Sequence, residues 1–253
     1  MVAYLTGGDP EPKLFLNNVA ALAEGGADII EIGIPFSDPI ADGPVIQSSS
    51  QRSLASGSTP NTVMDECQLI SEMYPEIPLV ILTYYNPIIA MGLERFMRRA
   101  GDVGVSGTVV PDLPVEESSD YRTAAAKNGI DTIFLAAPNT SETRLANIIH
   151  NSTGFLYLVS LFGVTGPRDS LSELALSSVK HVKNLSGGLP TAAGFGISRP
   201  DQVSAIIGSG ADGAIVGSAL VKLVTENLGD PERTAEALKI KTMVLKKATR
   251  RSS

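Results

Sequence analysis

The feature that most constrains the fold of this chain is an alternation of short apolar runs with longer amphipathic segments. Most of the runs are rich in β-branched or aromatic residues and stop at Gly, Pro, Asn or Asp, as strands do. They lack a clean polar alternation, which indicates strands buried on both faces of a parallel sheet. The strand candidates are residues 2–6, 27–34, 78–85, 107–112, 130–137, 154–161, 190–196 and 211–217.

The segments between these runs have helical periodicity and helix-boundary residues. In residues 11–27, Leu14, Val19, Leu22 and Ala23 share one face, and a Gly-Gly pair follows them. Ser or Thr near the start, or Gly at the end, marks four further helical segments: residues 59–75, 115–129, 141–154 and 198–210.

Repeated strand–helix units over 253 residues predict a (β/α)8 barrel, whose usual size is about 250 residues. An open doubly wound sheet is the alternative, but eight strand candidates and a uniform composition favour the barrel. There is no linker and no low-complexity segment, so we expect one domain over residues 1–253.

Charge and cysteine content exclude several classes of protein. A net charge of −7 without a strong basic run argues against nucleic acid or an anionic membrane surface as the main partner. No apolar run approaches the roughly 20 residues of a spanning helix. Cys67 is the single cysteine, so no internal disulfide can form, and we expect a cytoplasmic protein.

A buried carboxylate is the first candidate for chemistry. Glu31 lies in the second strand candidate between Ile30 and Ile32, and Asp38 and Asp42 follow in a proline-rich loop. Barrel enzymes act at the carboxyl ends of their strands, and burial raises a carboxyl pKa, which suits a general acid–base residue. The alternative is that Glu31 pairs with a buried cation while the aspartates form turns. However, no strand candidate contains Arg or Lys.

Other catalytic groups are missing from the places where a barrel would use them. His150 and His181 fall in helical segments, and Cys67 is expected to pack as a small hydrophobic residue. No metal-binding cluster, P-loop or Ser–His–Asp set is present in the sequence, so we predict no metal site. Acid–base chemistry therefore falls to carboxylates or tyrosines.

Glycines after the last two strand candidates suggest a phosphate site. Gly196, Gly217 and Ser218 lie where barrels often bind phosphate, at the loops after strands seven and eight. Backbone N–H groups and a helix N-terminus would favour an anion there. The alternative is that these glycines only form tight turns. A further loop, residues 162–170, contains two glycines and is either a mobile lid or an ordinary loop.

Five motifs occur in order along the chain: "GADIIEIGIPFSDPIADGPVIQ", "VPDLPVEES", "GVTG", "GFGIS" and "GAIVGSA". Together they closely resemble the tryptophan synthase alpha chain family, and the resemblance covers nearly the whole sequence. It implies a (β/α)8 barrel that cleaves indole-3-glycerol phosphate to indole and glyceraldehyde 3-phosphate. It also implies a cofactor-free chain that passes indole to a beta chain carrying pyridoxal phosphate, in a heterotetramer of two alpha and two beta chains.

The resemblance assigns roles to individual residues. Glu31 would protonate C3 of the indole and take a proton from the glycerol hydroxyl, and Asp42 would accept the indole N–H. Tyr157 matches a tyrosine near the catalytic glutamate, and Thr165 matches a lid threonine that helps to position the aspartate. The phosphate ligands would be Gly166, Gly196, Gly217 and Ser218. The walls of the indole pocket, or otherwise simply core, would be Tyr4, Leu82, Val109, Pro111 and Leu135. Contacts to the beta chain would be Asp38, Asn86 and Pro114.

The chain departs from the family pattern in two places. It begins almost directly at the first strand candidate, without most of the short helix that precedes the barrel in many members. Leu161 and Phe162 occupy lid positions that are often polar or basic.

Two other functions remain as alternatives. An indoleglycerol-phosphate synthase or a phosphoribosyl isomerase would share the phosphate loops, but the synthase would need a lysine at a strand end. Lys127, Lys180 and Lys183 are all in helical segments. The second alternative is a non-catalytic chain that binds a phosphate ligand and activates a beta chain. The intact pair of Glu31 and Asp42 argues against it.

Overall fold

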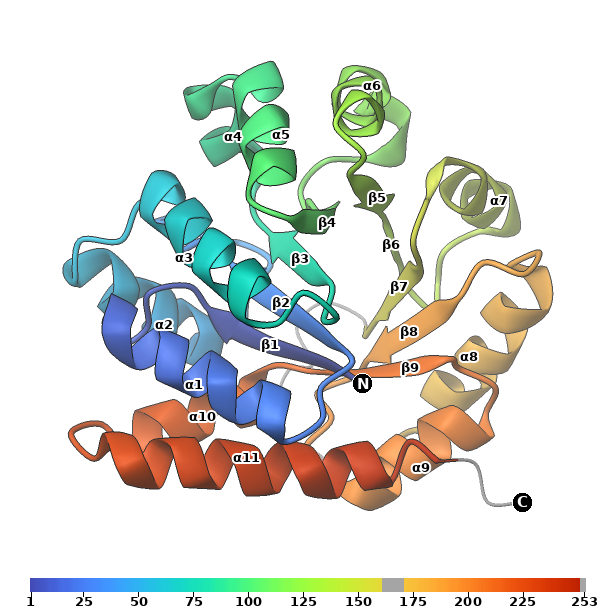
Figure 1. Ribbon diagram of the computed structural model, residues 1–253. Coiled ribbons are helices and arrows are strands. Elements are labelled where there is room, and N and C mark those ends of the chain that lie inside the picture. Colours follow the sequence, from blue (N-terminus) through green and yellow to red (C-terminus); the bar gives the residue numbers. More distant parts are fainter. Residues whose placement is uncertain (161–170, 251–253) are drawn as a thin grey trace.

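The strands form one parallel sheet that curls into a barrel (Figure 1). The structure is a computed structural model and describes residues 1–160 and 171–250. Neighbouring strands follow the order β5-β4-β3-β2-β1-β9-β8-β7-β6, and each pairing is parallel. The strands are β1 (Val2–Thr6), β2 (Ile29–Gly33), β3 (Leu79–Leu82), β4 (Val105–Val109), β5 (Asp131–Ile133), β6 (Leu135–Ala136), β7 (Leu156–Val159), β8 (Thr191–Gly194) and β9 (Gly213–Val216).

The segments β5 and β6 are two pieces of one barrel strand. Only Phe134 separates them, and its carbonyl accepts a hydrogen bond from Tyr157 N at 3.1 Å. β5 pairs with β4 on one side and β6 pairs with β7 on the other, so the sheet closes through this interrupted strand. Each of the predicted strand regions contains a strand, and the (β/α)8 prediction is confirmed.

Helices surround the barrel on the outside, as Figure 1 shows. In the described part of the chain, none of them is long and apolar enough to cross a membrane. The helices are α1 (Pro12–Glu24), α2 (Pro44–Ala55), α3 (Pro60–Met73), α4 (Tyr85–Met91), α5 (Leu93–Asp102), the 3-10 helix η1 (Val115–Glu117), α6 (Ser119–Lys127), α7 (Glu142–Asn151), α8 (Glu173–Leu185), α9 (Pro200–Gly208), α10 (Ser218–Glu226) and α11 (Pro231–Lys247).

The helix starts follow the capping residues in the sequence. Thr59 caps α3 through a reciprocal pair of hydrogen bonds with Thr62, and Ser141 caps α7 by accepting from Arg144 N. At α9, Gln202 instead bonds back to the backbone of Arg199 at 3.1 Å. These contacts satisfy amide groups that a helix start would otherwise leave without a partner.

Two apolar layers hold the molecule together. The barrel interior is filled by Val2, Val80, Val109, Ile133, Phe155, Ala192 and Ile215, and a larger shell packs between strands and helices. Within that outer shell, α1 and α11 approach closely at Gly25, where an added Cβ would lie 2.6 Å from Thr242 Cβ. The interior layer forms the floor beneath the carboxyl ends of the strands.

Candidate active site

Glu31 is the third residue of β2 and points into the barrel. Ile30 and Ile32 belong to the outer shell, so the side chain between them faces the interior. Its register partners are Tyr4 on β1 and Val80 on β3. Glu31 is 1% exposed, and neither carboxyl oxygen has a hydrogen-bond partner among the described residues. A buried carboxyl without partners is costly, which points to a role other than stability.

The burial of Glu31 changes its proton affinity. Desolvation, with a smaller contribution from the negative charge of Asp42, raises the pKa of Glu31 to about 8. The group therefore keeps its proton at neutral pH and can act as a general acid.

This shift predicts a pH-dependent stability. Between about 4.5 and about 8, the unfolded chain has released the Glu31 proton while the folded chain keeps it. The free energy of unfolding therefore falls by an amount on the order of a few kcal/mol as pH rises through this window. Above the window it levels off. We expect the free energy of unfolding, measured with urea, to decline less steeply with pH in Glu31→Gln than in the unaltered chain. Part of the pH dependence remains in this variant because of Glu66, whose pKa is raised to about 7 mainly by burial. Equal slopes in the two proteins would contradict the assignment.

Asp42 lies in the loop between β2 and α2, two residues before Pro44 starts the helix. Its amide donates to Pro39 O at 3.0 Å, which closes a turn. Burial raises the pKa of Asp42 to about 6, and a hydrogen bond from Tyr84 opposes that rise. At neutral pH Asp42 is therefore ionised while Glu31 is protonated, a division of roles between two carboxyl groups that acid–base enzymes use.

Two tyrosines, buried Tyr4 and half-buried Tyr157, also face this space. The pKa of Tyr157 on β7 is raised by burial and then by Glu31, Tyr4 and Asp42. The pKa of Tyr4 is raised by burial and then by Asp42, with a smaller contribution from Glu31. The four side chains therefore interact around one space, although they come from distant segments of the chain. The Tyr4 hydroxyl lies over Gly33, where an added Cβ would approach it to 2.2 Å.

Of the five predicted pocket walls, Tyr4 is described above, and the other four fall into different environments. Leu82 and Leu135 are half-buried and pack on the interior layer, as Tyr157 does. Val109 is part of that layer and is fully buried. Pro111 lines a cavity of about 120 Å³ beneath the connection from β4 to η1, together with Leu135. Their contact with an indole ring remains a prediction.

The predicted phosphate ligands lie at the ends of neighbouring strands. Gly196 follows β8 with a φ of +68°, a conformation that favours glycine. Gly217 is the N-cap of α10 and Ser218 its first residue, and no side chain of residues 1–160 or 171–250 caps this helix start. Because β8 pairs with β9, the two loops are adjacent. Thr165, Gly166, Leu161 and Phe162 lie outside the described residues.

The three predicted partner contacts, Asp38, Asn86 and Pro114, are all exposed. Sequence reasoning missed two features near them. Ile40, in the same loop as Asp38, is 82% exposed, which is unusual for so large an apolar side chain. Tyr84, two residues before Asn86, bonds to Asp42, and nothing in the local sequence signals that contact.

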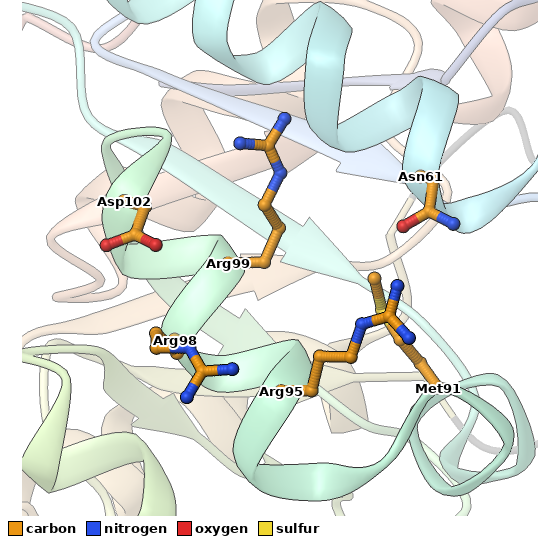
Figure 2. A pocket seen from close by; sticks show the side chains of 6 residues that line it. All are labelled: Asn61, Met91, Arg95, Arg98, Arg99 and Asp102. Atoms are coloured by element: carbon orange, nitrogen blue, oxygen red, sulfur yellow. The ribbon is translucent and has the colours of Figure 1, made fainter.

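A separate surface pocket of about 220 Å³ lies between α3 and α5 on the outside of the barrel (Figure 2). Arg95, Arg98 and Arg99 extend into it from α5, and Arg99 pairs with Asp65 on α3. The pocket contains none of the buried acid–base groups, so it is distinct from the site at the barrel mouth.

Other candidate chemistries find no matching group at this site in the part of the chain that the structure describes. Among the described residues, no three His, Cys, Asp and Glu side chains are grouped so as to hold a metal ion. Lys127 is in α6, and Lys180 and Lys183 are in α8, away from the carboxyl ends of the strands. Among the described residues, the acid–base groups at the barrel mouth are therefore Glu31, Asp42 and tyrosines.

Comparisons with known proteins agree with this geometry. A family model described as tryptophan synthase alpha chain matches residues 1–250. The tryptophan synthase alpha chain of Methanosarcina barkeri is 46% identical over 92% of this chain and 86% of its own length. That of Methanoregula boonei is 44% identical over 98% of this chain and 92% of its own. A structure from the tryptophan synthase α2β2 complex of Pyrococcus furiosus superposes with a TM-score of 0.90 and 41% identity, covering 98% of this chain and 97% of the other.

Proposed function

This chain belongs to the tryptophan synthase alpha chain family, and we propose that Glu31 and Asp42 are the acid–base pair with which it cleaves indole-3-glycerol phosphate. The products are indole and glyceraldehyde 3-phosphate. One observation carries the proposal: at the barrel mouth, buried Glu31 and half-buried Asp42 have pKa values near 8 and near 6, so one is protonated and the other ionised at neutral pH.

The two carboxyl groups divide the reaction between them. Neutral Glu31 donates its proton to C3 of the indole, which places positive charge on the ring nitrogen. Ionised Asp42 accepts the N–H hydrogen bond and stabilises that charge more than the neutral ground state. Glu31, now a carboxylate, takes the proton of the hydroxyl next to the ring. The carbon–carbon bond breaks, its electrons restore the indole, and the hydroxyl carbon becomes the aldehyde.

The remaining groups bind and orient the substrate. Tyr157 lies beside Glu31 in the barrel and would pack against the reacting atoms, and Tyr4, Leu82, Val109, Pro111 and Leu135 would contact the ring. Gly196, Gly217 and Ser218 would donate backbone N–H groups to the phosphate, with the dipole of α10 adding to the attraction. We extend the phosphate site to Gly166 and the lid to Thr165 from the family pattern.

We propose that a tryptophan synthase beta chain is the partner, in a heterotetramer of two alpha and two beta chains. The Pyrococcus furiosus structures of a tryptophan synthase complex support this, since one is described as an α2β2 complex with mutual activation. Asp38, Asn86 and Pro114 are the proposed contacts, and indole would pass from this chain to the beta chain. The reaction of the alpha chain uses no cofactor, and pyridoxal phosphate belongs to the beta chain.

Location and domain structure are proposed on simpler grounds. The free, buried thiol of Cys67 is compatible with a reducing cytoplasm. The continuous strand order supports a single barrel domain over residues 1–253.

Replacing Asp42 by asparagine tests the charge-stabilising role. The amide has nearly the same shape but carries no charge, so we expect kcat to fall by about 10²-fold, within the range for losing one preorganised electrostatic contact. Indole and glyceraldehyde 3-phosphate would be measured with saturating beta chain. Asp38→Asn, in the same loop but exposed, with a carboxylate that accepts from Ser37 and from no other side chain of the described residues, is the control for changes in beta-chain binding. A fully active Asp42→Asn would remove Asp42 from the proposal.

The non-catalytic alternative is tested by the unaltered chain. Indole release from indole-3-glycerol phosphate, measured with and without a tryptophan synthase beta chain, should rise when the beta chain is present. If the folded chain binds the substrate but releases no indole with or without the beta chain, its role is instead that of a non-catalytic activator.

A further inference from the structure

Tyr84 contacts Asp42 although the mechanism above does not use it. The residue lies between β3 and α4, is 2% exposed, and packs its ring against Phe36 with centroids 5.3 Å apart. Phe36 belongs to the loop that carries Asp42, so the tyrosine reaches across from the neighbouring strand to this loop.

The hydrogen bonds of Tyr84 have a defined direction. Ala41 N donates to the Tyr84 hydroxyl oxygen at 2.9 Å. The same hydroxyl lies 3.1 Å from Asp42 Oδ2 and donates to it. An amide N–H can only donate, and a phenol has one proton, so that proton is directed to the carboxylate. One side chain thus holds both the backbone and the carboxylate of two successive loop residues.

This contact occupies only one oxygen of Asp42. Within the described residues, Oδ1 accepts no hydrogen bond from the protein, whereas Oδ2 is taken by Tyr84. Since the carboxylate is held through Oδ2, its rotation is restricted and Oδ1 remains as an acceptor. A fixed acceptor costs no reorganisation when charge develops on a substrate nitrogen.

We propose that Tyr84 is a positioning residue of the cleavage reaction, whose hydroxyl holds Asp42 by Oδ2 so that Oδ1 accepts the indole N–H. The inference rests on the proposed role of Asp42. The proposed role of Asp42 requires only its charge. The inference adds that full activity also requires a phenol hydroxyl at position 84.

The contact also has a pH signature. Burial raises the pKa of Asp42, and the Tyr84 hydrogen bond lowers it, so removing the hydroxyl should raise it above its present value of about 6. The other groups that interact electrostatically with these residues are Glu31 on β2, Tyr4 on β1, Tyr157 on β7 and Asp112 after β4. None of them is changed by replacing tyrosine with phenylalanine at position 84. The acidic limb of the kcat profile should therefore move to higher pH.

The test is Tyr84→Phe, assayed with indole-3-glycerol phosphate and saturating beta chain across pH. We expect kcat to fall about tenfold with a smaller change in KM, and the acidic limb to move upward. Tyr74→Phe is the matched control, because its hydroxyl makes no hydrogen bond with the described residues, and it should leave both unchanged. Phe36→Leu, which loosens the ring contact but keeps the hydroxyl, should leave the acidic limb in place and separates packing from hydrogen bonding.

A double variant distinguishes the inference from the proposal on which it rests. In Asp42→Asn, adding Tyr84→Phe should cause little further loss, because both changes remove the same arrangement. An unchanged kcat and acidic limb in Tyr84→Phe, with Asp42→Asn impaired, would overturn the role of Tyr84 alone. The role of Tyr84 would also be overturned if the two losses in kcat multiply in the double variant and the acidic limb of Tyr84→Phe does not move. That result would indicate a structural contribution instead. Full activity of Asp42→Asn itself would overturn the proposed function of Asp42 as well.

Discussion

Glu31→Gln is expected to reduce indole release by about 10³-fold while the chain remains folded. Glutamine preserves the shape of the side chain but can neither donate the proton to C3 nor accept one from the hydroxyl. General acid–base groups contribute about 10²- to 10⁴-fold, and Glu31 serves in both directions, so we expect a loss within this range. The loss should fall on kcat at every pH, measured as indole and glyceraldehyde 3-phosphate formed with saturating beta chain.

Glu66→Gln is the matched control for this experiment. Glu66 on α3 is also buried, and its pKa is also raised, with burial as the largest cause. It lies outside the barrel interior, so the same substitution there should leave kcat within about twofold. Comparable losses in both variants would mean that removing any buried carboxyl disturbs the fold, and the role of Glu31 would have to be abandoned.

The second large effect concerns stability at the barrel mouth. Arg52→Met should lower the free energy of unfolding at pH 8 by about 3 kcal/mol, the lower end for breaking a buried ion pair from one side. Arg52 on α2 holds Asp9, in the loop after β1, through two hydrogen bonds of 2.9 and 2.8 Å. Asp9 is 4% exposed, so without Arg52 its charge would be buried without its cation.

The pH dependence of this loss has a definite sign. Burial raises the pKa of Asp9 and Arg52 opposes that rise, so Arg52→Met should raise it further. A carboxyl with a raised pKa destabilises the fold more as pH increases, because the unfolded chain then ionises more readily. The loss should therefore be larger at pH 8 than at pH 4, measured by urea unfolding. Arg98→Met, at an exposed arginine without an ion pair to the described residues, should cost less than about 0.5 kcal/mol. An equal cost at the two positions would contradict the importance of the pair.

Much of the fold followed from local patterns. The strand candidates all contain strands because a run of apolar residues bounded by Gly, Pro, Asn or Asp is itself the physical requirement for a strand buried on both faces. The first and last residues of the strands were less well predicted: the strand expected at 107–112 begins at Val105 and ends at Val109. The interruption at Phe134 has no signal in the sequence, because it depends on hydrogen bonds to two neighbouring strands.

For the candidate site, the sequence alone determined which residues carry charge and how apolar their neighbours are. Glu31 between two isoleucines, on a strand without cations, already indicated a buried carboxyl with a raised pKa, and the structure agrees in direction. The order of motifs indicated the family, which the comparisons then established.

Only the tertiary structure decided which of these groups meet. Tyr84 lies 42 residues from Asp42, and no local periodicity relates them; they touch because β2 and β3 are neighbours whose following loops lie at the same edge of the barrel. The division of pKa values near 8 and near 6 has the same origin, since it depends on how water is excluded around each carboxyl and on the donor that Tyr84 supplies. Sequence pattern determines burial along one strand, whereas contacts between loops depend on strand register and on the loop conformations that follow from it.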